Sequence, residues 1–136
     1  MGDTQPADER LADTLLQLTQ RLLDSIAQGD WATYEELCDP SLTAFEPEAA
    51  GHLITGLAFH RFYFERLPHD PPPQTTISSP HVRLLGDAAI VSYTRLVQQL
   101  DGAGVPHTAS YEETRVWQRQ DSGWKHVHFH RSAASQ

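Results

Sequence analysis

Residues 89–119 read AIVSYTRLVQQLDGAGVPHTASYEETRVWQR. Residues 89–100 and 108–119 are long runs rich in β-branched and aromatic side chains, a composition typical of β-strands. The segment between them contains Asp101, Gly102 and Gly104, which suit a tight hairpin connection. The stretch therefore predicts two long antiparallel strands.

Further strands are expected on both sides of this hairpin. They are placed at residues 41–46, 52–54, 75–79, 82–85 and 124–131. Pro80 interrupts one of these runs, because proline cannot donate a hydrogen bond to a neighbouring strand. Together with the hairpin, these segments predict a curved antiparallel sheet of about six strands.

The first part of the chain has helical periodicity instead. Leu11, Leu15, Leu18 and Leu22 recur at spacings of three and four, which predicts an amphipathic helix. Three helices are expected, at residues 8–28, 31–38 and 57–67, and a proline-rich loop follows at 68–73. Residues 1–7 are expected to form a frayed tail, and residues 8–133 a single domain. Helices that precede a run of strands indicate an α+β fold, with the N-terminal helices packed in the curved sheet.

Composition excludes several classes of function. The 136 residues include 18 acidic and 10 basic ones, a net charge of -8, which disfavours nucleic acid as a partner. No apolar run approaches the roughly 18 residues of a membrane-spanning helix, so no membrane partner is expected. The single cysteine, Cys38, excludes an internal disulfide and suits a reducing, cytoplasmic environment. No nucleophile motif or phosphate-binding glycine loop is present, and no cofactor is expected.

Three arginines lie on predicted strands. Arg95 and Arg115 are in the middle of long strands, and Arg131 ends the last one. If the strands are neighbours, these side chains can line one pocket together with His60 of the third helix. A buried arginine must be paired or bind an anion, because an unpaired buried charge is costly. The alternative is that the arginines pair with Glu112, Glu113 or a facing carboxylate on a solvent-exposed face and that His60 is a core residue.

His126, His128 and His130 alternate along the last strand, so we expect them to share one face of the sheet. Such a row of imidazoles can bind zinc. No carboxylate or thiolate completes the set, and no helical His-Glu-x-x-His pattern is present. A packed surface is therefore favoured over a metal site, and no metal is expected.

Four blocks of sequence resemble the association (hub) domain of calcium/calmodulin-dependent protein kinase II. They are residues 38–49 (CDPSLTAFEPEA), 59–65 (FHRFYFE), 112–117 (EETRVW) and 127–132 (VHFHRS). The similarity runs from about residue 15 to residue 132. It implies a cone-shaped α+β barrel of the nuclear transport factor 2-like (NTF2-like) class. It also implies self-assembly into dimers that stack into rings, and a deep arginine-lined cavity that binds small carboxylates through His60, Arg95, Arg115 and Arg131.

Two departures from that family limit what the resemblance implies. The kinase signatures and a basic calmodulin-binding helix are missing, and the loop at 68–73 is shortened and lacks the family's tryptophan. We therefore expect a non-catalytic oligomerisation domain whose partner is itself, with a small anion in its cavity. The alternative is a small-molecule enzyme of the same class, of isomerase or dehydratase type, using His60 and Tyr93. A carboxylate beside His60 favours the enzyme, and an arginine-only cavity favours anion binding.

Overall fold

The computed structural model describes residues 4–67 and 70–134 of the chain. The helical part contains α1 (Thr4–Gln28), α2 (Trp31–Leu37), the 3-10 turn η1 (Pro47–Ala49) and α3 (Ala58–Arg66). Two strands lie among these helices, β1 (Cys38–Phe45) and β2 (Ile54–Thr55). Four long strands follow: β3 (Gln74–Leu85), β4 (Ala88–Leu100), β5 (Pro106–Gln120) and β6 (Gly123–Ala133). The α+β class and the number of strands predicted from the sequence are confirmed.

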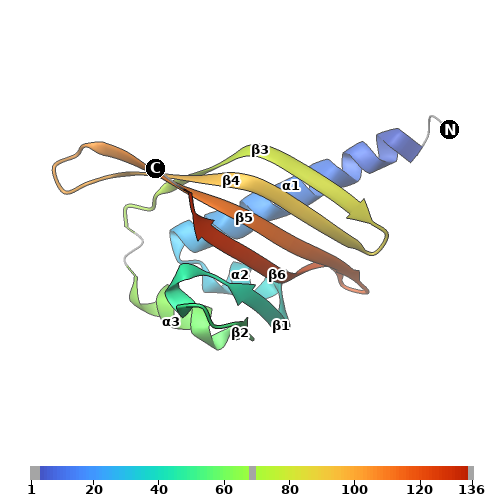
Figure 1. The fold of residues 1–136 in the computed structure, drawn as a ribbon, viewed down its shortest axis with the longest axis horizontal. Coiled ribbons are helices and arrows are strands. Elements are labelled where there is room, and N and C mark those ends of the chain that lie inside the picture. The colour runs from blue at the N-terminus through green and yellow to red at the C-terminus, as the bar shows by residue number, and fades with distance from the viewer. Residues whose placement is uncertain (1–3, 68–69, 135–136) are drawn as a thin grey trace.

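The six strands form one curved sheet in the order β2-β1-β6-β5-β4-β3. The sheet bends over α1, which lies along its concave side, and α2 and α3 lie at one end of that side (Figure 1). The prediction of an entirely antiparallel sheet is wrong at one pairing, because β1 runs parallel to β6. A parallel pair needs a long connection, and here the connection contains α3 and four strands.

The helix boundaries differ slightly from those expected. The first helix begins at Thr4, so Thr4–Ala7, predicted as part of a frayed tail, is helical. Pro6 is tolerated there because the N–H groups of a first helical turn have no partner within the helix. Residues 1–3 of the expected tail lie outside the described residues, as do residues 68 and 69 of the expected loop. The third helix falls within the predicted range.

The concave side of the sheet and the buried face of α1 form the core. It contains the fully buried side chains of Leu15 and Leu22 from α1, together with Tyr34, Leu42 and Trp117. The Trp117 Nε1–H group donates a hydrogen bond of 3.2 Å to Oγ1 of Thr19. This bond satisfies two buried polar groups at once and ties the helix to β5.

Two bulges change the side-chain pattern that simple alternation predicts. In β3 the pairing shifts between Ser78 and His81, with Ser79 at φ 52°, so the expected break at Pro80 is a bulge within one strand. In β6 the register also shifts, since Trp117 pairs with His126 and Val116 pairs with His128. An extra residue in a strand reverses the facing of every residue beyond it.

The expectation that the three histidines of β6 share a face is therefore wrong. His126 is fully buried, whereas His128 is half-buried and His130 is exposed. Within residues 4–67 and 70–134, no group of three or more His, Cys, Asp or Glu side chains could hold a metal ion. In the same part of the chain, no helix is long and apolar enough to cross a membrane.

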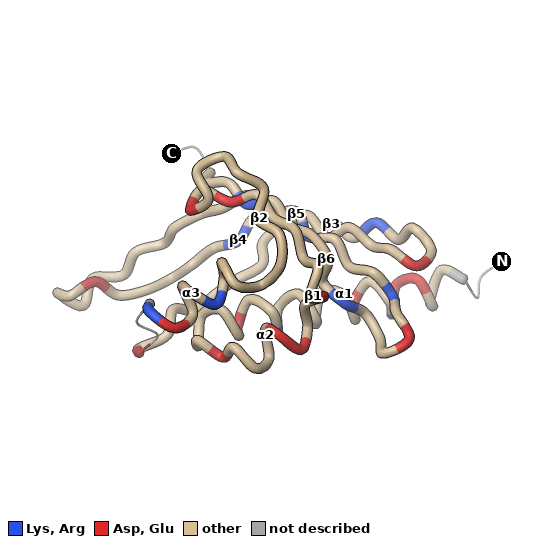
Figure 2. The backbone as a smooth tube through the Cα atoms, turned by 90° about the horizontal axis from the view of Figure 1, so that it is seen from below, with Lys and Arg blue, Asp and Glu red and all other residues tan. Residues whose placement is uncertain are grey.

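The β4–β5 hairpin extends beyond the body of the domain, as both views show (Figures 1 and 2). Its turn is held by Asp101, whose Oδ1 accepts hydrogen bonds from the backbone N–H groups of Ala103 (2.8 Å) and Val105 (3.0 Å). Basic and acidic positions are spread over many elements of the fold (Figure 2). Among the described arginines, Arg95 and Arg115 are buried.

Candidate functional site

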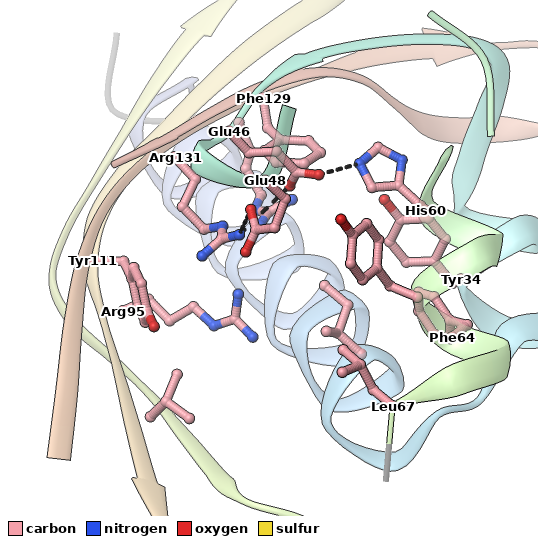
Figure 3. A pocket seen from close by; sticks show the side chains of 14 residues that line it. Tyr34, Glu46, Glu48, His60, Phe64, Leu67, Arg95, Tyr111, Phe129 and Arg131 are labelled. Carbon is pink, nitrogen blue, oxygen red and sulfur yellow. Dashed lines mark hydrogen bonds and ion pairs between the residues drawn. The ribbon is translucent and has the colours of Figure 1, made fainter. Parts of the chain in front are cut away.

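A cavity of about 240 Å³ lies between the concave side of the sheet and helices α2 and α3 (Figure 3). Its walls combine aromatic rings from the helices with charged side chains from the strands and from the η1 segment. The lining residues are Ile26, Tyr34, Glu46, Glu48, His60, Tyr63, Phe64, Leu67, Arg95, Val97, Tyr111, Arg115, Phe129 and Arg131. All four site residues expected from the sequence are among them.

Glu113, buried on β5, is the centre of the charge network beside the cavity. It stands opposite Tyr93 of β4 and opposite Arg131 of β6, so one row crosses three strands. Its Oε1 accepts hydrogen bonds from Tyr93 Oη (2.5 Å) and from Arg115 Nη2 (3.0 Å), and its Oε2 accepts one from Arg95 Nη1 (3.2 Å). Burial alone would raise the pKa of Glu113, but Arg115 and Arg95 lower it to about 2.

Arg115 is fully buried and has polar partners along its whole guanidinium group. Besides Glu113, its Nε donates to Tyr93 Oη at 2.8 Å, and its Nη1 lies 3.5 Å from His126 Nε2. The guanidinium carbon lies 4.4 Å from the centre of the Phe129 ring. Burial would lower the pKa of Arg115, but Glu113 raises it above its usual value. Arg115 therefore forms the back of the cavity as one member of a buried ion pair.

Arg95 has donors left over. Its Nη1 binds Glu113, but its buried Nε has no hydrogen-bond partner among the described residues. The guanidinium group points into the open part of the cavity (Figure 3). A buried donor without a partner is costly, and an anion in the cavity would supply one.

Arg131 faces the same space from β6, but two carboxylates already contact it. Its Nη2 donates a hydrogen bond to Glu48 Oε2 and lies 3.7 Å from Glu46 Oε2. The Arg131 guanidinium also lies over the ring of Tyr111, 5.0 Å from its centre. Arg131 thus connects the sheet to the segment that follows β1, which carries both glutamates.

His60 is buried at the opposite wall, on the side of α3 that faces the cavity. Its Nε2 lies 3.2 Å from Glu46 Oε1, which is also buried, and Figure 3 shows the two side chains directed at each other. The contact has ion-pair distance without hydrogen-bond geometry, so both ring nitrogens lack a hydrogen-bond partner among the described residues. His60 packs between the rings of Tyr34 and Phe129, at centroid distances of 5.9 and 5.4 Å.

His126 supports the cavity from behind Arg115. Its Nδ1 lies 3.5 Å from the sulfur of Cys38, and its ring stacks on Phe129 at 5.6 Å. Burial and the neighbouring Arg115 lower the pKa of His126 well below its usual value, so the ring is neutral in the folded protein. Burial raises the pKa of Cys38 to about 12, which keeps the thiol protonated.

From the sequence, Glu113 was named only as a possible partner of the arginines, and Glu46 and Glu48 were not included in the site. The place of Glu113 beside Arg115 follows from the strand, because a residue two positions before Arg115 shares its face. The alternative expectation had the arginines paired with glutamates on a solvent-exposed face, but the pairing with Glu113 is internal. Glu46 and Glu48 could not have been placed, since their positions depend on the pairing of β1 with β6. Tyr93 lies beneath the cavity rather than in its wall, bonded to Glu113 and Arg115.

Comparison with known proteins identifies the family. Residues 12–135 match the model of the calcium/calmodulin dependent protein kinase II association domain. The delta subunit of calcium/calmodulin-dependent protein kinase type II from Oryctolagus cuniculus is 50% identical over 123 residues. That match covers 88% of this chain but only 23% of the rabbit protein.

Solved structures agree with this match. The association domain of C. elegans CaMKII is 44% identical, with a TM-score of 0.87, and the match covers 96% of this chain and 99% of that one. An NTF2-like superfamily protein from Salmonella enterica is only 17% identical, but has a TM-score of 0.78 over 95% of this chain and 94% of its own. This last likeness concerns the fold alone, and it confirms the expected NTF2-like class. The chain belongs to the calcium/calmodulin dependent protein kinase II association domain family.

Proposed function

We propose that this chain is an oligomerisation domain that assembles with copies of itself and binds a small anion in its cavity. The observation that supports assembly is the match to association domains over nearly the whole chain. Large apolar side chains are also exposed on several elements, among them Phe45, Leu53 and Phe62. Contact between copies would remove such surface from water, and closed symmetric assemblies are the usual result. The proposal includes no catalytic role. The lone, buried and protonated Cys38 thiol suits the cytoplasm.

Assembly is tested by the mass of the protein in solution. At micromolar concentration, light scattering is expected to give a multiple of 15.3 kDa, with a dimer as the minimum and a closed ring as the expected form. Dilution should shift the distribution towards dimers before monomers if rings are stacks of dimers. A mass near that of one chain at all concentrations would contradict the proposal.

Anion binding is proposed because the buried Nε of Arg95 has no hydrogen-bond partner among the described residues. A carboxylate has two planar oxygens, and a guanidinium group offers donors in a matching fork. The net charge of -8 does not attract anions from a distance, so the affinity must come from contacts inside the partly desolvated cavity. Each charge-assisted contact contributes about 1.5–3 kcal/mol, and a ligand of few atoms is therefore expected to bind weakly, in the micromolar to millimolar range.

The test of this site is calorimetric titration of glycolate, a short hydroxy-carboxylate, into the assembled protein. Arg95→Gln is expected to weaken binding about tenfold or more, since one charge-assisted contact is lost. Arg83→Gln is the matched control, because Arg83 is an exposed arginine on the neighbouring strand β3. Equal heats for the wild type and Arg95→Gln, or an equal loss in Arg83→Gln, would end this part of the proposal.

One observation favours a second candidate, a small-molecule enzyme of isomerase or dehydratase type. Glu46 is the carboxylate beside His60 that a proton-transfer pair requires, and both groups are buried in the cavity. Tyr93 is not available to such an enzyme, because its hydroxyl is bonded within the Glu113 network. The test is exchange of carbon-bound protons of a small oxo-acid in heavy water, followed by NMR. Exchange that Glu46→Gln abolishes would favour the enzyme over the binding domain.

A further inference from the structure

The segment between β1 and β2 brings a second carboxylate to the cavity. Glu48 lies on η1, whose backbone hydrogen bonds are local: Ala49 N–H donates to Glu46 O and Ala50 N–H to Pro47 O, both at 3.1 Å. The turn then continues through Ala50 at φ 53°. From this turn the Glu48 side chain reaches across to Arg131 of β6 (Figure 3).

The two glutamates near Arg131 differ in their surroundings. The Glu46 side chain is 7% exposed and is held between Arg131 and His60, whereas the Glu48 side chain is 37% exposed. A carboxylate at the cavity rim can exchange its partner for water at little cost, but a buried one cannot. Glu48 is therefore the carboxylate whose contact with Arg131 can be broken at little cost.

The Arg131 side chain is less free than the Glu48 side chain to move away from the cavity. Its side chain is 13% exposed, and it lies over the Tyr111 ring and opposite Glu113 in the sheet. When Glu48 moves away, the Arg131 Nη2 group that it occupied can bind an anion in the cavity that Arg95 also lines. The cavity then offers two guanidinium groups to one incoming anion instead of one.

We propose that Glu48 is an internal competitor, a carboxylate that occupies Arg131 in the empty cavity and must be displaced when an external carboxylate binds. This inference rests on the proposed anion-binding function and adds a regulatory device to it. The apparent affinity of such a site equals its intrinsic affinity multiplied by the fraction of molecules in which Glu48 does not occupy Arg131. If Glu48 occupies Arg131 about nine-tenths of the time, its removal raises the affinity about tenfold.

The experiment compares glycolate binding to the assembled wild-type protein, Glu48→Gln, Arg131→Gln and the double variant, by calorimetry at fixed pH and salt. Glu48→Gln is expected to bind about tenfold more tightly, because the amide is a weaker partner for Arg131. The gain should vanish in the double variant, since it depends on Arg131. Glu36→Gln, which removes the same charge from an exposed position on α2, should leave the affinity unchanged.

The outcomes separate this inference from the function on which it rests. If the wild type binds and Glu48→Gln binds equally or more weakly, the competitor is refuted while anion binding stands. A gain that persists without Arg131, or that Glu36→Gln reproduces, also refutes it. If neither the wild type nor Glu48→Gln binds glycolate, both proposals fail. Binding that appears only in Glu48→Gln and depends on Arg131 supports both.

Discussion

Replacing Glu113 by Gln is expected to lower the free energy of unfolding by about 3–5 kcal/mol, the usual cost of removing one partner of a buried ion pair. Glu113 is the carboxylate shared by the buried Arg95 and Arg115. The substitution keeps the size of the side chain but leaves two buried cations beside each other with no negative charge between them. It also replaces one of the two carboxylate oxygens by an NH2 group, so one oxygen is left to accept from Tyr93, Arg115 and Arg95.

The measurement is urea unfolding followed by tryptophan fluorescence, at a fixed protein concentration because assembly contributes to stability. The matched control is Glu112→Gln, one position earlier on the same strand, where the side chain is exposed. That control should change stability by less than about 0.5 kcal/mol. Arg115→Gln should cost less than Glu113→Gln, because Arg95 still pairs with the carboxylate and like-charge crowding is relieved. Equal stability of Glu113→Gln and the wild type would contradict this account.

Acid is expected to destabilise the protein in two steps. The pKa of His126 is depressed well below its usual value of 6.5, so on acidification the unfolded chain takes up a proton that the folded chain refuses. Stability is therefore complete above about pH 6.5 and falls below it, by up to about 1.4 kcal/mol per pH unit for this group. Glu113 adds a second loss between its ordinary pKa of 4.5 and its folded value of about 2.

Unfolding at a series of pH values from 7.5 to 3 tests this expectation. His126→Gln, which cannot take up a proton, should be less stable at neutral pH but flatter between pH 6.5 and 4.5. The slope should not vanish, since the half-buried His128 also has a lowered pKa. His81→Gln, at an exposed site on β3, is the control and should keep the wild-type slope. A wild-type profile that is level down to pH 4.5 would refute the role of His126.

The elements of this fold are predictable because their signals are local. Leucines spaced by three and four define α1, and the β-branched run around Arg95 defines β4, so each is evident within a dozen residues. The face of His126 is not predictable in this way. Its burial follows from a bulge in β6, where two residues oppose one on β5, and alternation alone places it on the wrong side.

The same difference between short-range and long-range features applies to the residues of the candidate site. Arg95 and Arg115 are placed in one cavity by a hairpin, a short-range feature, and period-two alternation also places Glu113 beside Arg115. The contacts of Glu46 and Glu48 need the pairing of β1 with β6, which joins distant parts of the chain. A resemblance to a family can name the arginines, and alternation gives the place of Glu113, but the two carboxylates that contact Arg131 are located only once β1 is paired with β6.

The position of β6 also determines the order in which the domain can be built. β6 lies between β5 and β1, and Thr43 and His128, which meet across that seam, are separated by 85 positions in the chain. During synthesis the β4–β5 hairpin can form as soon as it leaves the ribosome, whereas β1, made much earlier, can pair only with the short strand β2 until β6 is made. Helix α1 can pack on β3, β4 and β5 before the last strand is made, but β1 and the segment that follows it are joined to the rest of the sheet only when β6 arrives. The charged cavity is completed only by that closing step, so a chain stalled before residue 123 carries Arg95 and Arg115 without the glutamates of the opposite wall in place.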